Sequence, residues 1–261
     1  MAISVLEKTG TKVRQLEVRL AEDQYEIEMA LALRYNVFNL EMGEGLPQSR
    51  STQKDRDEYD YYCDHLIVLD KSEDNKVVGT YRILKGKVAR ENIGFYSETE
   101  FDLSKIYGFA DEVAEVGRSC VHKDYRGGSV ISLLWAGFAE YITEHNVRYL
   151  MGCGSIHSTD SEQASEIYAY LREKGQLAGE KFFIEPYKTH RVPGFDPNYK
   201  ILDLKETGKR LPPLIKGYLR LGAKICGLPA LDMLFGTIDL FVLFDSNNIV
   251  SKYAKHYHIE K

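Results

Sequence analysis

The sequence lacks a long uninterrupted apolar run. Its most apolar stretch, residues 228–244, is broken by Asp232 and Asp239, whereas a membrane-spanning helix needs about 20 consecutive apolar residues. The first twenty residues carry charges throughout and show no apolar segment followed by small residues, which a secretory signal would have. We therefore expect a cytoplasmic protein that does not cross the bilayer.

The sequence also has few cysteines and no excess of positive charge. The four cysteines are far apart and lack the paired short spacings of a zinc or redox site, so we expect reduced thiols, no metal and no bound cofactor. A formal net charge of −5 gives no global field that would attract nucleic acid. We therefore expect no nucleic-acid partner.

Helix-like and strand-like patterns alternate along the chain without an internal repeat, which favours an α/β fold. Strand-like segments are 13–19, 65–70, 76–84, 112–121, 148–153 and 237–244. Helix-like segments are 22–38, 129–145, 161–173 and 214–225, and residues 41–64 read as a long surface loop. We expect one domain over 1–261, with a core at about 12–185 and a C-terminal elaboration at about 186–261.

The densest chemical signal is the segment from Glu115 to His122, which places two charged residues inside a strand. Simple alternation puts Glu115 and Ser119 on one face and Arg118 on the other. An edge-strand salt bridge is one interpretation. The other is a carboxylate and a guanidinium in a functional cleft.

This strand runs into Arg126-Gly127-Gly128-Ser129, directly before a predicted helix. Backbone N–H groups at such a turn and at a helix N-terminus can hold an anion such as phosphate. An ordinary tight turn would have the same spacing.

Residues 115–134 resemble the fourth strand, phosphate loop and third helix of the GNAT-like acetyltransferase superfamily. Within it, the chain resembles most the ornithine-lipid (amino-acid) N-acyltransferases, which are related to acyl-homoserine-lactone synthases. Further matching motifs are Arg-Tyr-Asn-Val-Phe at 34–38, Glu-Tyr-Asp at 58–60 with Asp-His-Leu at 64–66, Val-Gly-Thr-Tyr-Arg at 78–82, and the segment 211–223. The last of these resembles the ornithine-lipid branch and not the lactone synthases.

The resemblance implies a mixed central sheet flanked by helices, with helical and strand elaboration at the C-terminus. It also implies transfer of a long acyl chain, often 3-hydroxylated, from acyl carrier protein thioester to an amino acid. Ornithine is the leading acceptor, and the product would be a lyso-aminolipid. The alternatives are a lactone synthase-like enzyme and a non-catalytic protein that binds acyl carrier protein, since some relatives are labelled haemolysins.

An amine that attacks a thioester must first lose a proton, and a carboxylate can accept it directly or through one water. Glu115 is the first candidate for this base, with Asp57, Asp60 and Asp64 as alternatives on the acidic loop. We expect the catalytic residues to be Glu115, Arg118 and Asp60. Expected substrate-binding residues are Arg34, Phe38, Asp57, Asp64, Arg82, Ser119 and Cys120, because arginine clamps carboxylates through two parallel hydrogen bonds.

The donor is expected to be acyl carrier protein, not coenzyme A. Counting from Arg126, Ser129 and Ile131 occupy positions where the superfamily has small residues, and a branched side chain hinders close backbone approach to a pyrophosphate. Expected donor-binding residues are Arg126, Gly127, Gly128, Ser129, Lys216, Arg220 and Lys224.

Lys216, Arg220 and Lys224 recur every four residues, which predicts a basic stripe on one helix face. Such a stripe would suit an acidic carrier protein or, at the inner face of the membrane, anionic lipid; a merely solvated helix face is the alternative.

Two histidine arrangements suggest other chemistry. Cys120 and His122 fall on one strand face and would suit a covalent acyl-cysteine route, although direct transfer is favoured because free cysteine is so often simply buried. Ser155, His157 and Asp160 have the residue types of a hydrolytic triad, but a loop histidine is the favoured interpretation of His157.

Overall fold

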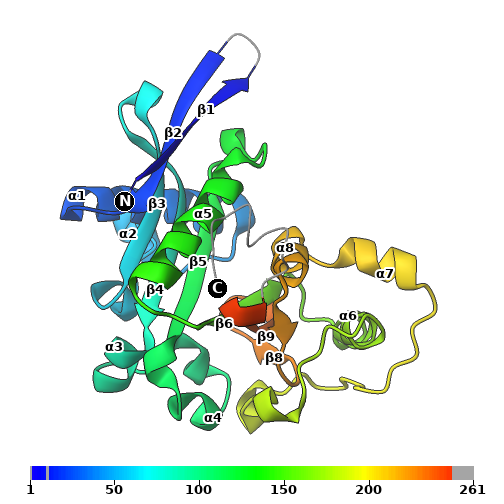
Figure 1. The fold of residues 1–261 in the computed structure, drawn as a ribbon. Helices are drawn as coiled ribbons and strands as arrows, with labels where there is room; N and C mark the ends of the chain where they lie inside the picture. Colours follow the sequence, from blue (N-terminus) through cyan, green and yellow to red (C-terminus); the bar gives the residue numbers. More distant parts are fainter. Residues whose placement is uncertain (1, 10–11, 249–261) are drawn as a thin grey trace.

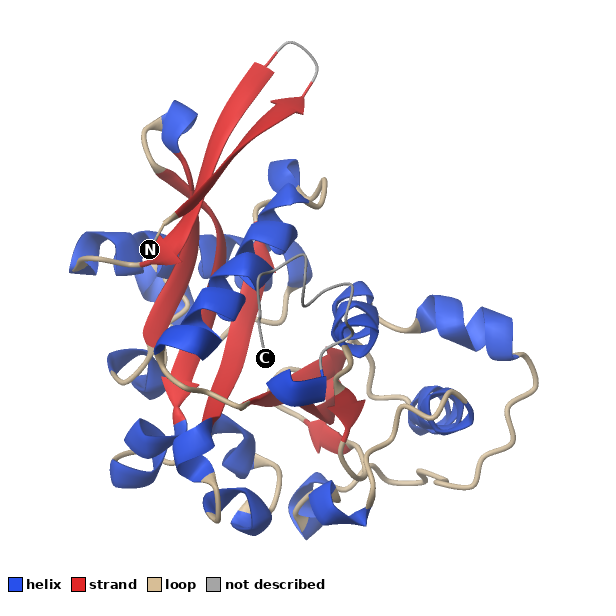
Figure 2. Ribbon diagram, in the orientation of Figure 1, coloured by secondary structure: helices blue, strands red, loops and turns tan. Residues whose placement is uncertain are grey.

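The computed structural model describes residues 2–9 and 12–248; residues 249–261, which the sequence indicates to be a basic tail, lie outside the described residues. The described chain forms one nine-stranded sheet in the order β1-β2-β3-β4-β5-β6-β9-β7, with β8 paired to β9 (Figures 1 and 2). All neighbouring strands are antiparallel except β5 and β6, which are parallel. The expected α/β class with a mixed sheet is confirmed.

The strands are β1 (Ile3–Thr9), β2 (Lys12–Leu20), β3 (Asp64–Asp70), β4 (Lys76–Lys85), β5 (Val113–Val121), β6 (Tyr149–Ile156), β7 (Lys224–Ile225), β8 (Ala230–Asp232) and β9 (Thr237–Asp245). The α-helices are α1 (Gln24–Arg34), α2 (Ser49–Thr52), α3 (Gly86–Glu91), α4 (Ser104–Tyr107), α5 (Ser129–Glu144), α6 (Ser161–Glu173), α7 (Leu204–Arg210) and α8 (Pro213–Leu221). A π-helix, Tyr35–Met42, continues α1. No helix among the described residues is long and apolar enough to cross a membrane.

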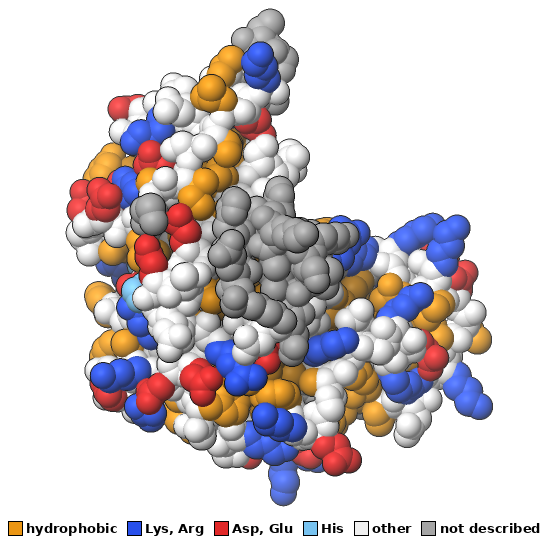
Figure 3. All heavy atoms as spheres, in the orientation of Figure 1, with side chains coloured by type: hydrophobic (Ala, Val, Ile, Leu, Met, Phe, Trp, Pro, Cys, Tyr) orange, Lys and Arg blue, Asp and Glu red, His pale blue; other side chains and the backbone are white. Residues whose placement is uncertain are grey.

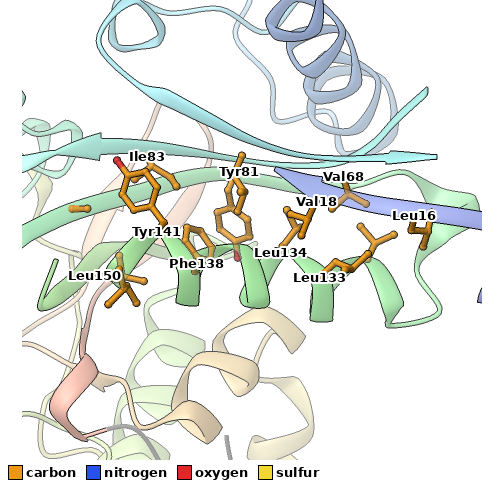
Figure 4. Packing of buried hydrophobic residues seen from close by; sticks show 14 of the residues in the cluster. Leu16, Val18, Val68, Tyr81, Ile83, Leu133, Leu134, Phe138, Tyr141 and Leu150 are labelled. Carbon is orange, nitrogen blue, oxygen red and sulfur yellow. The ribbon is translucent and has the colours of Figure 1, made fainter. Parts of the chain in front are cut away.

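Helices α1 and α5 cover opposite faces of the strands in the first half of the sheet. Alternation along β3 divides its side chains: Leu66 and Val68 belong to the cluster under α5, and Ile67 and Leu69 to the cluster under α1. Figure 4 shows α5 residues such as Phe138 packed against the sheet. Because both faces are covered, β3 is apolar throughout its middle and reads as a continuous hydrophobic run.

The sheet opens between β5 and β6. Only residues 113–115 of β5 pair with residues 149–151 of β6, although each strand continues for several residues beyond this pairing. At the last point of contact, a Cβ added to Gly152 would lie 2.3 Å from the carbonyl oxygen of Val116, so only glycine fits there. Beyond this point the two strands diverge, and backbone and side chains on both of them become free to face a ligand.

A β-bulge in β5 lies beside this opening. Thr80 of β4 pairs with Cys120, but the next pair is Arg82 with Gly117, so β5 carries an extra residue. Arg118 takes up the distortion with a φ of +51°, which is unfavourable for a residue other than glycine. The expectation of simple alternation along 115–121 is therefore wrong: the bulge changes the direction of the side chains after Gly117.

The helix predicted over 214–225 is shorter than expected. α8 ends at Leu221 because Gly222 adopts a left-handed conformation with a φ of +112°. Lys224 lies in β7, where its Nζ donates to the carbonyl oxygen of Gly175 at 2.7 Å. The expectation that Lys216, Arg220 and Lys224 form one helical stripe is therefore wrong for Lys224.

Candidate active site

A cavity of about 470 Å³ occupies the opening of the sheet. Its walls come from the bulged half of β5, the diverging end of β6, the start of β9, the π-helix after α1, and the first turns of α8. The site residues predicted from the sequence that line this cavity are Phe38, Arg82, Glu115, Arg118, Ser119, Cys120 and Arg126. Segments far apart in the sequence thus meet at one place.

Glu115 is 5% exposed and is held by the segment that follows α3. Its carboxylate accepts from the backbone N–H of Tyr96 at 2.6 Å and from the N–H and hydroxyl of Ser97 at 2.8 and 2.6 Å. Burial raises the pKa of Glu115, while these hydrogen bonds and the charge of Arg82 oppose the rise. The result is a fixed carboxylate with an elevated pKa facing the cavity, which suits a general base.

Arg118 lines the cavity and is paired with the acidic loop at longer distances than Arg34 or Arg82. Its nearest carboxylate atoms, on Asp55 and Asp57, are 3.7 Å away, and its buried Nη2 has no hydrogen-bond partner among the described residues. The rings of Phe235 and Phe38 lie 4.7 and 5.8 Å from its Cζ and hold the group by cation–π contacts. A carboxylate ligand could therefore bind it with two hydrogen bonds.

Arg34 and Arg82 instead belong to a buried ionic network. Arg34 donates to Asp55 at 2.8 and 2.6 Å and to Asp60 at 2.6 and 3.2 Å, and Arg82 donates to Asp57 and Asp60. Burial would raise the pKa of Asp60, but the charges of Arg34 and Arg82 hold it well below its usual value. Asp60 is thus an ionised counter-ion, which disfavours it as a proton acceptor.

The remaining acidic candidate, Asp64, lies apart from the cavity lining. It accepts from the Tyr141 hydroxyl at 2.7 Å and pairs with Lys85 at 3.2 Å. Arg34, Asp57 and Asp60 are also not among the lining residues, so the acidic loop supports Arg82 and Arg118 from behind.

The turn before α5 contributes Arg126 to the cavity lining but not Gly127, Gly128 or Ser129, so donor binding by these three stays a prediction. Gly128 has a φ of +106°, where a side chain would be strained, and a Cβ at either Gly127 or Gly128 would meet no close steric obstacle. Arg126, at the same turn, pairs with Glu41 and reaches the cavity wall. Ile131 is half-buried and packs against the core under α5.

His157 does not form a triad. Its Nδ1 lies 2.9 Å from a carboxylate oxygen of Glu44, and Asp160 caps α6 by accepting from the N–H of Glu162. The interpretation of His157 as a loop histidine agrees with this placement.

Cys120 lines the cavity but lies in an apolar environment with Ala30, Leu33 and Val37. Burial raises the pKa of its thiol to about 12, whereas a nucleophilic cysteine needs a lowered pKa. We expect Cys120→Ala to retain acyl-transfer activity within about threefold, since the smaller side chain removes no reacting group. Steady-state kinetics of the folded variant check this, and loss of all turnover would restore the acyl-cysteine route.

A second, apolar cavity of about 70 Å³ adjoins the first and shares Val116, Cys153 and Tyr218 with it. It lies between α5, β6 and α8 and is lined mainly by side chains such as Trp135 and Leu150. An apolar cavity behind the reacting groups is suited to the start of a hydrocarbon chain.

Several lining residues were missed from the sequence: Tyr96, Cys153, Phe235 and Asp239. The sequence carried a signal for Asp239, because it interrupts an otherwise apolar strand. The segment 86–111, which brings Tyr96 and Ser97 to Glu115, had no clear pattern and was not assigned.

Comparison with known proteins defines the class. Residues 33–136 match the acetyltransferase (GNAT) domain family. An N-acyl amino acid synthase from uncultured soil microbes shares the fold, with a TM-score of 0.52 at 11% identity over 92% of this chain and 98% of that one. The protein is an acyltransferase of the GNAT class.

Sequence relatives narrow the assignment. The chain is 34% identical to an L-ornithine N(alpha)-acyltransferase of Agrobacterium fabrum, over 94% of this chain and 86% of the relative. It is 34% identical to a Brucella abortus protein of the same name, over 95% and 91% of the two chains. The chain belongs to the family of L-ornithine N(alpha)-acyltransferases.

Proposed function

We propose that the protein transfers a long-chain, 3-hydroxy fatty acyl group from acyl carrier protein thioester to the α-amino group of ornithine. The observation that carries this proposal is the position of Glu115 and Arg118 in the open part of the sheet, beside an apolar cavity. The names of the relatives support ornithine as the acceptor. The product is a lyso-aminolipid, made in the cytoplasm at the inner membrane surface.

Different residues of the cavity carry out different steps of the proposed reaction. Arg118 binds the carboxylate of the amino acid, and Glu115 takes the proton of the attacking amine directly or through one water. The amine nitrogen bonds to the thioester carbon, the C–S bond breaks, and the thiol leaves with a proton. Backbone N–H groups at the bulge of β5 would stabilise the oxyanion as it forms.

The reaction is tested by incubating purified protein with 3-hydroxyacyl-carrier-protein thioester and a panel of amino acids. N-acyl ornithine should be the main product by lipid mass spectrometry, and free carrier thiol should appear in equal amount. Absence of product with every amino acid would refute the proposed function. A product cyclised from S-adenosylmethionine would indicate the lactone synthase alternative.

Carrier protein as donor is supported by basic residues near the cavity. Lys216 and Arg220 lie on α8, whose first turns line the cavity, and Figure 3 shows lysine and arginine side chains over α7 and α8. Acyl carrier proteins are acidic, so such a surface would accelerate encounter through electrostatic steering.

We expect the double variant Lys216→Glu/Arg220→Glu to raise KM for acyl carrier protein at least ~5-fold at low salt, with kcat unchanged. The effect should shrink near 0.5 M salt, because exposed charges are screened beyond a few ångströms there. Lys181→Glu/Lys188→Glu, an equal change of charge on exposed residues away from α8, is the control. Equal KM values for the two double variants would remove α8 as the docking surface.

A further inference from the structure

Two carboxylates and a cysteine, two of them in the cavity lining, have no role in the chemistry above. A carboxylate oxygen of Glu100, the sulfur of Cys153 and a carboxylate oxygen of Asp239 all lie within 4.8 Å of one another. Cys153 and Asp239 line the cavity from β6 and β9. Glu100 comes from the same segment as Ser97, which holds Glu115.

Glu100 is the unusual member of this group. It is 2% exposed, and neither carboxylate oxygen has a hydrogen-bond partner among the described residues. Burying such a group without a partner is strongly unfavourable when the group is charged. Its nearest polar neighbours, Asp239 and Cys153, add no positive charge.

The surroundings oppose ionisation of both carboxyl groups as long as no cation is bound. Burial, with the charges of Asp239, Asp232 and Glu115, raises the pKa of Glu100 to about 9, and burial with Asp232 raises that of Asp239 to about 6. Asp239 accepts a hydrogen bond from the Thr237 hydroxyl at 3.1 Å, but among the described residues no lysine or arginine is paired with either carboxylate. A bound cation would allow both groups to ionise.

We propose that Glu100 and Asp239 bind the side-chain ammonium of a diamino-acid acceptor and so select it over neutral amino acids. This inference rests on the proposed function. Each of the three charges of such an acceptor then has a partner. Arg118 and Glu115, which line the cavity, face its α-carboxylate and its reacting amine. Its distal ammonium meets Asp239, which also lines the cavity, and Glu100, which adjoins Asp239.

Ser97 lies between Glu115 and the Glu100–Cys153–Asp239 group. The Ser97 hydroxyl donates to Glu115 at 2.6 Å and lies 3.4 Å from the Cys153 sulfur. The amine-activating carboxylate and the acidic pair therefore adjoin each other, as the two nitrogens of a short diamino acid require.

A divalent metal is the rival occupant, since thiolate and carboxylate are also zinc ligands. Three observations favour ammonium. Burial raises the pKa of the Cys153 thiol well above its ordinary value, which disfavours the thiolate that zinc needs. The group contains three donor residues, fewer than the four of a closed structural zinc site. Two of the three, Cys153 and Asp239, also line the acceptor's own cavity.

The test compares ornithine with norvaline, which has the same carbon chain without the distal amine. Wild-type kcat/KM should favour ornithine by at least ~100-fold, because a site built for a polar group rejects an analogue that lacks it. Glu100→Gln and, independently, Asp239→Asn should reduce this preference to within ~10-fold, chiefly by raising KM for ornithine. Asp102→Asn, an exposed acidic change two residues from Glu100, should keep the wild-type preference.

Calorimetry of ornithine binding without donor gives a second readout in folded protein. Binding should release protons in wild type, seen as a heat that depends on the buffer, and Glu100→Gln should abolish that release. Equal use of norvaline and ornithine by the wild type would overturn the ammonium site while leaving acyl transfer intact. Stoichiometric zinc in the purified protein would overturn it in favour of a metal, and failure to acylate any amino acid would reject the proposed function and the site together.

Discussion

Glu115→Gln is expected to lower kcat by about 100-fold or more, because general-base assistance contributes about that much. The amine substrate is mostly protonated at neutral pH, and Glu115 is the buried carboxylate that lines the cavity on the bulged strand. The measurement is steady-state acyl transfer with saturating ornithine, together with a thermal melt to show that the variant is folded.

The pH profile separates a base from a residue that only holds the structure. Wild-type kcat should rise and then level off above the pKa of Glu115. The variant should continue to rise with pH, since only amine that has already lost its proton in solution can then react. Ser97→Ala removes one hydrogen bond to Glu115 and leaves the carboxylate, so it should retain the wild-type profile shape. A Glu115→Gln rate within threefold of wild type would exclude this residue as the base.

Arg34→Met is expected to reduce the free energy of unfolding by about 3–5 kcal/mol, the range for removing one partner of a buried ion pair. Arg34 is 1% exposed and supplies four hydrogen bonds to Asp55 and Asp60. Without it, Asp55 loses its hydrogen-bonded cation, and Arg82 alone still donates to Asp60. Urea unfolding of the variant and wild type gives the difference directly.

The matched control is Arg90→Met, which breaks the exposed pair of Arg90 with Asp111. Such pairs contribute about 0–1 kcal/mol, so this variant should be nearly as stable as wild type. Similar losses in both variants would show that the buried network does not stabilise the fold. Acidification should also reduce the free energy of unfolding. Because folding lowers the pKa of Asp60, this carboxylate stabilises the fold above its ordinary pKa near 3.8, and the stabilisation is lost as the pH falls below that value.

Periodicity in the sequence located most regular elements to within a few residues. α6 was predicted over 161–173 and is found there, and the strands at 65–70, 76–84 and 237–244 each lie within a slightly longer strand. These segments are long, strongly patterned and bounded by caps or turns. The boundary of α8 was missed because two alternatives, continued helix and a left-handed glycine, are both compatible with a single Gly222.

The candidate site was only partly accessible from the sequence. Glu115 and Arg118 stood out because charged residues within a strand are unusual, and both do line the cavity. Arg34 and Arg82 were expected to bind substrate because arginine clamps carboxylates, yet their charges are neutralised by the acidic loop. A sequence shows which charges are present, but not which of them already have partners.

The sequence by itself determined the class of fold, the family and the strand that carries Glu115, because these depend on local periodicity and on motifs that are contiguous in the chain. The tertiary structure alone decided where the sheet opens, since that depends on how far β5 and β6 pair before they diverge. It also decided that Glu100, Cys153 and Asp239 meet. These residues come from segments far apart in the sequence, and only the packing of β6 and β9 with the segment after α3 brings their side chains within reach of one ligand.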